Sequence, residues 1–172
     1  DSTIKSVTLA AGANAGTVTF GAGTNTLTLG TASAGALTVN DTGLATNDVL
    51  NIATSKTANS GNGKALTVGG FETVNIDTNT ATAKTLGAVI VNGDPDSAGA
   101  NTSATLDVAG AANLTVAAVT LGSSTAGTGT IDASDMTGNF IQSADAVGVT
   151  TITGGSGNDT IEGSVLASTL TG

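Results

Sequence analysis

The sequence predicts an all-β protein that folds as a parallel β-solenoid (a β-helix or β-roll) with short strands and turns rich in Gly and Asn. Three observations support this fold class: short apolar-x-apolar triplets recur along the chain, clusters of Gly, Ala, Ser and Asn separate them, and large side chains are scarce. Aromatic residues make up 2% of the 172 residues, and Trp, Tyr and Cys are absent. Because aromatic side chains dominate thick cores, thin layers of Val, Ile and Leu are easier to build from this chain.

The triplets alternate apolar and polar residues and contain many β-branched side chains, which predicts β-strands. One short strand cannot bury its apolar face alone, so the chain is expected to coil and to stack equivalent residues about 4.8 Å apart. About 18 residues per turn would give about nine turns and a rod about 45 Å long. The expected strands lie at 7–9, 18–20, 27–29, 37–39, 49–52, 66–68, 74–76, 89–91, 106–108 and 114–116, with weaker copies at 130–132, 140–141, 151–153, 160–162 and 169–171.

Two other folds compete with the solenoid. Disorder is disfavoured because 39% of the residues are hydrophobic and they are spread along the chain. An antiparallel β-sandwich also has short strands and frequent turns, but hairpin dipeptides are few, at Asn62-Gly63 and Asn92-Gly93. We therefore expect residues 1–172 to form a single β-solenoid segment, a piece of a larger protein.

The charge of the chain restricts its partners. The net charge is −9, with 13 acidic residues, four lysines and no arginine. Nucleic acids and anionic membrane surfaces need clustered cationic side chains, so neither is an expected partner, and no apolar run is long enough for membrane insertion. Without Cys or His, zinc sites and thiolate or imidazole catalysis are excluded. An acidic chain of this kind favours divalent cations as partners.

The clearest motif is GGSGNDTIE at residues 154–162, which matches the calcium-binding nonapeptide G-G-x-G-x-D-x-U-x at every fixed position. Its glycines are expected to allow a tight turn, Asp159 offers the hard carboxylate oxygen that calcium prefers, and Ile161 is expected to face the core. A degenerate copy at 163–171 has Ser168 in place of the Asp. Residues 154–172 are thus predicted to be nonapeptide-like repeats, with a plain Gly-rich turn as the alternative.

Two further acidic groups are candidate metal ligands. Asp94 and Asp96 offer oxygen ligands at alternate positions, as at the start of an EF-hand loop, but Ser103 stands where the bidentate Glu would be. Asp132 and Asp135 flank a short turn and can share an ion. Solvated acidic turns remain the alternative for both groups.

Other acidic residues carry weaker predictions. Asp41, Asp48 and Asp77 are expected to be turn or cap residues. Glu72 could take part in catalysis only with a second carboxylate, as glycosidases require, and the sequence locates no such partner. We therefore expect no enzymatic activity.

Three phrases resemble RTX-type bacterial S-layer proteins: NDVLN at 47–51 followed by GFETVNI at 70–76, TIDASDMTG at 130–138, and GGSGNDTIEGS from residue 154. The likeness runs from about residue 47 to the end of the chain. It implies export by a type I system, calcium that rigidifies the solenoid, and lattice assembly at the cell surface. It also implies that Asp159 is a calcium ligand assisted by the carbonyls of Gly155 and Gly157.

The expected function is therefore that of a structural component of a bacterial surface layer or extracellular fibre, secreted, calcium-stabilised and self-associating into a lattice or filament. Other regions of the parent protein would bind cell-surface polysaccharide. One alternative is an adhesin or ice-binding module, suggested by Thr-x-Thr steps at 17–19, 26–28 and 151–153. Another is a non-catalytic RTX region of a secreted hydrolase.

Overall fold

The computed structural model describes residues 4–9, 16–30, 35–42, 47–54, 59, 63–78, 81–92, 103–122 and 128–172. This part of the chain is all-β, and it contains no helix that could cross a membrane. Its strands are β1 (Ser6–Leu9), β2 (Gly16–Phe20), β3 (Thr24–Leu29), β4 (Leu37–Asp41), β5 (Val49–Thr54), β6 (Leu66–Gly69), β7 (Thr73–Asp77), β8 (Lys84–Asn92), β9 (Thr105–Ala109), β10 (Leu114–Leu121), β11 (Gly129–Asp132), β12 (Phe140–Gln142), β13 (Val149–Thr153) and β14 (Thr169–Thr171).

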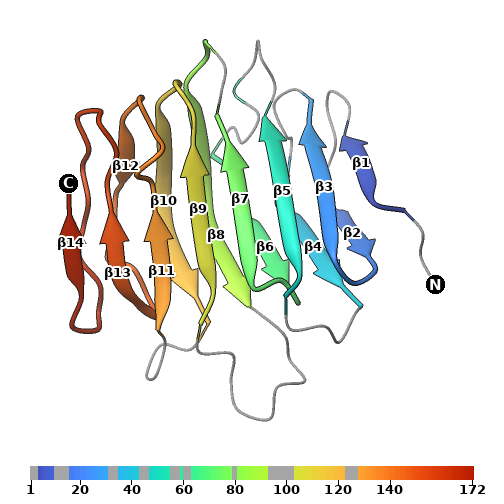
Figure 1. Cartoon of the computed structure of the whole chain (residues 1–172). Helices are drawn as coiled ribbons and strands as arrows, with labels where there is room; N and C mark the ends of the chain where they lie inside the picture. Colours follow the sequence, from blue (N-terminus) through green and yellow to red (C-terminus); the bar gives the residue numbers. More distant parts are fainter. Residues whose placement is uncertain are drawn as a thin grey trace.

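The strands form two parallel sheets that pack face to face along a rod (Figure 1). The eight-stranded sheet has the order β1-β3-β5-β7-β9-β11-β13-β14, and the six-stranded sheet has the order β12-β10-β8-β6-β4-β2. The chain thus crosses from one sheet to the other and returns one strand further along, and the two termini lie at opposite ends of the rod. Every pair of neighbouring strands is parallel. The predicted parallel β-solenoid is confirmed, and the antiparallel sandwich is excluded.

The turns are longer and less uniform than predicted. Val49 lies beside Thr73, 24 residues further on. Thr73 lies beside Thr105, 32 residues further on. Only at the last turn, where Thr151 lies beside Thr169, is the repeat 18 residues. The eight stacked strands therefore make seven turns rather than nine, about 34 Å along the rod at the usual spacing between strands. Extra residues at the corners leave the ladder undisturbed, because only the strand residues must stay in register.

One continuous apolar core runs between the two sheets. Inward-facing residues in register stack into columns, so that each aliphatic side chain packs on its equivalent in the next turn. The central column of the eight-stranded sheet is Leu50, Val74, Leu106, Ile131 and Ile152. A column of the six-stranded sheet is Val39, Val68, Val91 and Leu121. The predicted thin layers of branched aliphatic residues are thus present, and they are held by burial of apolar surface.

The few aromatic side chains lie inside this core. Phe20, Phe71 and Phe140 are all fully buried. The rings of Phe20 and Phe71 pack edge to face, with centroids 6.5 Å apart and an angle of 79° between the ring planes. The core also encloses polar side chains, which are Asn25, Asp48, Thr78, Lys84 and Gln142. Buried polar groups need hydrogen-bond partners, so these five residues are candidates for a structural or binding role inside the core.

Candidate functional site

The nonapeptide lies between β13 and β14, and its acidic residue ties two turns together. Oδ1 of Asp159 accepts a hydrogen bond from the backbone N–H of Phe140 (2.8 Å), which belongs to the preceding turn. Oδ2 accepts one from the backbone N–H of Gly155 (2.7 Å). Both oxygens of this carboxylate thus bind the backbone, and each keeps further lone pairs that a cation can use.

Glycine is required in the nonapeptide because backbone atoms of the preceding turn lie close to these residues, and not because their φ angles are positive. None of Gly154, Gly155 and Gly157 has a positive φ. A Cβ at Gly155 would overlap the carbonyl oxygen of Met136, and one at Gly157 would overlap that of Gly138. A Cβ at Gly154 would lie 2.6 Å from Oδ2 of Asp159. The glycines therefore let this turn pack against residues 133–138 of the turn before it. This contact between turns was not predicted from the sequence.

The rest of the motif pairs with β12. Thr160 donates its N–H to the carbonyl of Phe140 (2.9 Å) and accepts from the N–H of Gln142 (2.8 Å), so the expected strand at 160–162 is reduced to a bridge. Ile161 packs against the core but is only partly buried. In the degenerate copy, Leu170 on β14 is 48% exposed. Burial is therefore lower in the last turn, which has one neighbouring turn rather than two within residues 1–172.

Asp132 is the last residue of β11, and Asp135 lies in the loop that follows it. Oδ1 of Asp132 accepts a hydrogen bond from the backbone N–H of Ser134 (3.0 Å), which is the turn-forming role named as the alternative. In register, Asp132 lies beside Asp107 of β9, which sequence analysis missed. Burial raises the pKa of Asp107, and the charges of Asp132 and Asp135 raise it further. The signal that could have found Asp107 is the similarity of the triplets TLD at 105–107 and TID at 130–132.

These three carboxylates do not form a ready-made ligand sphere. Within the described residues, no group of three or more Asp, Glu, His or Cys side chains is arranged to hold a metal ion. The predicted ligands Asp94 and Asp96 lie outside the described residues. Calcium binding at Asp159, Gly155, Gly157, Asp132 and Asp135 therefore stays a prediction.

Glu72 hydrogen-bonds a residue that also carries a carboxylate, and the sequence did not locate this neighbour. Its Oε2 accepts a hydrogen bond from the backbone N–H of Asp48 (2.8 Å), one turn earlier. Asp48 directly precedes β5, and its side chain is fully buried. Glu72 is partly exposed, so the two side chains differ in their access to solvent.

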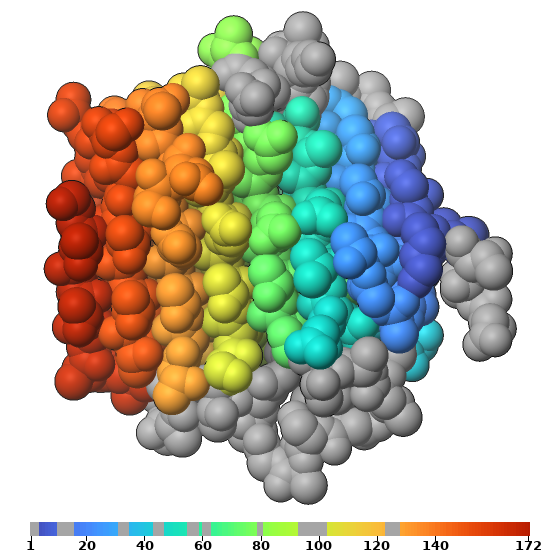
Figure 2. All heavy atoms as spheres, in the orientation of Figure 1, coloured from blue at the N-terminus to red at the C-terminus, as the bar shows by residue number. Residues whose placement is uncertain are grey.

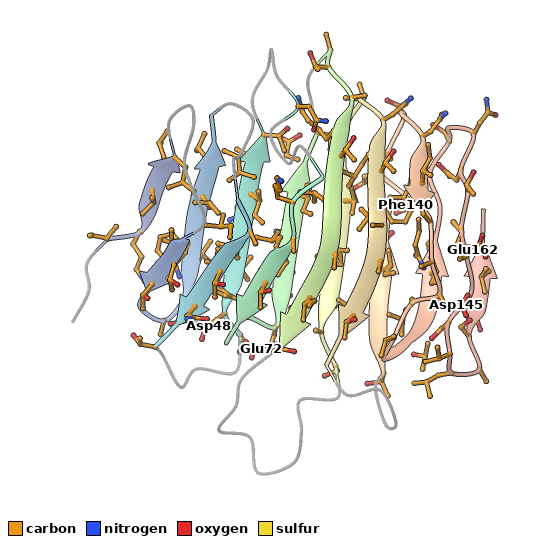
Figure 3. The ribbon with its side chains drawn as sticks, turned by 180° about the vertical axis from the view of Figure 1, so that it is seen from behind. Asp48, Glu72, Phe140, Asp145 and Glu162 are labelled. Atoms are coloured by element: carbon orange, nitrogen blue, oxygen red, sulfur yellow. The ribbon has the colours of Figure 1, made fainter. Side chains whose placement is uncertain are left out.

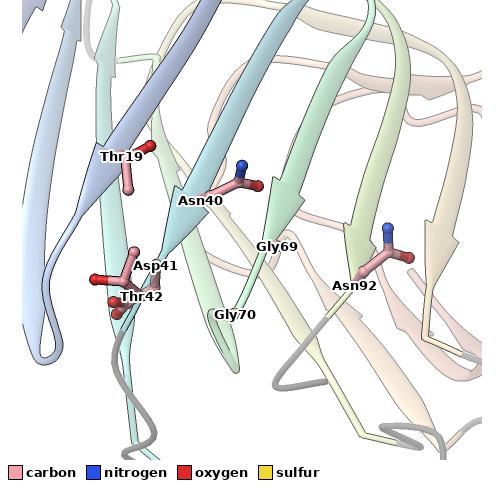
Figure 4. Close-up of a pocket in the computed structure, with 7 residues that line it drawn as sticks. All are labelled: Thr19, Asn40, Asp41, Thr42, Gly69, Gly70 and Asn92. Atoms are coloured by element: carbon pink, nitrogen blue, oxygen red, sulfur yellow. The ribbon is translucent and has the colours of Figure 1, made fainter. Parts of the chain in front are cut away.

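A groove of about 470 Å³ lies on the outer face of the six-stranded sheet, where β2, β4, β6 and β8 end (Figure 4). Thr19, Asn40, Gly69 and Asn92 occupy equivalent positions on these four strands. The groove is hollow because Gly69 places no side chain between the amides of Asn40 and Asn92. These groups can hydrogen-bond a polar ligand. The lining residues are Thr19, Asn40, Asp41, Thr42, Gly69, Gly70 and Asn92.

The outer face of the eight-stranded sheet carries rows of short polar side chains. Figure 2 shows this face as parallel bands, one for each turn. One row consists of threonine on five successive turns: Thr73, Thr105, Thr130, Thr151 and Thr169. The predicted Thr-x-Thr steps at 26–28 and 151–153 also belong to this sheet, whereas the step at 17–19 lies on β2 in the other sheet. The three steps therefore do not form one array.

Comparisons with protein-family models, with curated proteins and with solved structures found no match to this chain.

Proposed function

We propose that this chain is a non-enzymatic structural module of a secreted bacterial surface layer or extracellular fibre, stabilised by calcium and able to self-associate. The observation that carries this proposal is the uninterrupted stack of parallel strands around a single aliphatic core. In such a stack each turn contacts only its neighbours, so length is gained by adding turns. A rod of this kind suits a load-bearing or spacing element.

The charge of the rod supports a role for calcium. A net charge of −9 on a small rod disfavours the compact state through self-repulsion, and bound divalent cations relieve it. The resemblance of residues 154–162 to the RTX nonapeptide supports Asp159 as one ligand. Its two backbone hydrogen bonds hold the carboxylate in place between two turns, so an ion bound there would join them.

The two ends of the rod support self-association. Ile4 at one end is 57% exposed, and Val165 and Leu170 at the other end are 57% and 48% exposed. The outer edges of β1 and β14 have no paired strand within the described residues. Such edges are templates for pairing with another strand, so each end of this stack can continue into a further turn, from a longer chain or from a second copy.

The proposal is tested by adding calcium to the chain in a chelator-treated solution. We expect the β-sheet circular dichroism signal and the melting temperature to rise, and particles to grow in light scattering and electron microscopy. Asp159→Asn should weaken the calcium response, whereas Glu162→Gln, an exposed carboxylate in the same motif, should not. A wild-type signal that does not respond to calcium and remains monodisperse would contradict the proposal.

The threonine row favours a second candidate, a ligand-binding face of an adhesin or ice-binding module. Its hydroxyls repeat at the spacing between strands, about 4.8 Å, on five turns. The next row is less regular, because Asn75, Asp107 and Asp132 occupy it on three turns before Thr153 and Thr171. An ice-recrystallisation assay tests the ice-binding form directly, and growth of ice crystals at the buffer rate would exclude it.

A further inference from the structure

Three polar side chains meet at the end of the eight-stranded sheet where β3, β5 and β7 begin. Asp48 directly precedes β5 and Glu72 directly precedes β7, and the pairing of Val49 with Thr73 places them on adjacent turns. Figure 3 shows both acidic residues at the same end of the strands. Asn25 is the second residue of β3, one turn earlier. Asn25 and Asp48 are both fully buried.

Each carboxylate uses only one of its two oxygens. Oδ1 of Asp48 accepts a hydrogen bond from the backbone N–H of Gly23, and Oε2 of Glu72 accepts one from the backbone N–H of Asp48 (2.8 Å). The second oxygens, Oδ2 of Asp48 and Oε1 of Glu72, are buried without a hydrogen-bond partner. On the following turn the equivalent position is Ala104, so the acidic pair stands alone in its column.

The amide of Asn25 offers a third oxygen. Its Nδ2 donates to the carbonyls of Gly21 and Gly23, both at 2.9 Å. This pair of acceptors fixes the orientation of the amide, because a flipped amide would set oxygen against oxygen. Oδ1 is buried and lacks a hydrogen-bond partner. Gly23 thus bonds both Asn25 and Asp48, and the backbone N–H of Asp48 bonds Glu72, so backbone groups link the three side chains.

In the part of the chain that the structure describes, no lysine donates a hydrogen bond to either of the two second oxygens. The nearby ammonium of Lys5 donates to the carbonyls of Gly21 and Ala22 rather than to a carboxylate. Within the described residues, no lysine forms an ion pair with Asp48 or Glu72. The two carboxylates lie on adjacent turns and repel each other, and each buried oxygen without a partner is a cost to the fold. Such an arrangement favours a bound cation.

We propose that Asp48, Glu72 and Asn25 hold an internal calcium ion that joins the turns of β3, β5 and β7. All three offered atoms are hard oxygens, the ligands that calcium prefers, and calcium accepts the flexible coordination that a mixed set of carboxylate, amide and backbone oxygens gives. Two carboxylates would neutralise the ion. This site involves neither the nonapeptide nor the outer face of the rod, and it does not depend on the proposed surface role.

The test counts calcium ions bound to the whole chain by equilibrium dialysis and by titration calorimetry, since the chain has no Trp or Tyr for a fluorescence assay. Glu72→Gln and Asp48→Asn should each bind one ion fewer than wild type, or bind that ion roughly 100-fold more weakly. Glu162→Gln, which removes an exposed carboxylate, should bind as wild type does. Full retention of ion number and affinity in both acidic variants overturns the site.

A second variant covers the case in which the acidic variants do not fold. Asn25→Leu matches Leu50, its neighbour in the same column, and keeps both carboxylates. The calcium-induced rise in melting temperature should be smaller in Asn25→Leu than in wild type, and an unchanged rise overturns the site. Asp159→Asn separates the two proposals: loss of an ion in this variant alone would support the nonapeptide and refute the internal site.

Discussion

The middle of the rod (β5, β7 and β9) and its C-terminal end (residues 149–172) are built from the same kinds of residue but are held together differently. In the middle, the column of Leu50, Val74 and Leu106 is fully buried, and the corner carboxylate of Asp48 has one oxygen without a partner. At the end, Leu170 is 48% exposed, but both oxygens of Asp159 bind backbone amides. The middle is held by burial of apolar side chains and tolerates a carboxylate oxygen without a hydrogen bond at its turn. The C-terminal end buries less and depends on the hydrogen bonds of Asp159.

The largest expected effect separates burial in the two regions. Leu106→Ala leaves a cavity between Val74 and Ile131 in the core column and should lower the free energy of unfolding by about 2–5 kcal/mol. Leu170→Ala, in the same column at the exposed end, should change it by less than about 0.5 kcal/mol. Urea unfolding followed by circular dichroism in chelator measures both. Equal losses would mean that the end of the rod is buried in solution, as by self-association.

The next largest loss of stability is expected where the last turns pack closely against each other. Gly155→Ala drives a Cβ into the carbonyl of Met136 and should destabilise the chain by about 1–3 kcal/mol. Gly163→Ala is the matched control, because a Cβ there meets nothing within 4 Å. Thermal unfolding of both variants checks this difference. If Gly155→Ala were as stable as its control, the C-terminal turn would not be pressed against residues 133–138.

The same substitution at the two corners should have different effects. In chelator, Asp159→Asn places an amide N–H₂ against a backbone N–H and should cost about 1–3 kcal/mol. Asp48→Asn keeps an oxygen for Gly23 and replaces an oxygen that lacks a partner, so it should cost nothing or stabilise the apo chain. Melting temperatures of the two variants, compared with wild type, measure the contrast. A larger loss at Asp48 than at Asp159 would reverse our description of the two corners.

Much of the fold follows from local pattern, because period-two triplets such as 66–68 and 106–108 must bury one face and a stack of parallel turns lets each do so. The length of each turn did not follow, since corner residues between strands do not affect the register. The hydrogen bond between Glu72 and the backbone N–H of Asp48 could not be predicted from the sequence either. These residues are separated by 24 positions, and only the observed turn length brings them together.

The same limit applies to the acidic residues on the outer face. Asp132 and Asp135 were recognised because they are close in sequence, whereas Asp107 joins them only through the 25-residue spacing of β9 and β11. Asp159 was found because its motif is local. Sequence alone therefore identified contacts within one turn and missed contacts between turns.

The smallest expected effect concerns Asp107 on β9, the strand of the middle region that lies nearest to the C-terminal end. Its pKa is raised above its ordinary value by burial and by Asp132 and Asp135, so the folded state binds its proton more tightly than the unfolded state does. Its contribution to stability is thus fully present below the ordinary Asp pKa and is lost as the pH rises through the raised value. Asp107→Asn removes this loss and should stabilise the chain near pH 7 by less than about 1 kcal/mol, because solvent screens a half-buried group. The gain, measured by urea unfolding between pH 3 and pH 7, should shrink as the pH falls. A gain that is independent of pH would show that the three carboxylates do not repel one another.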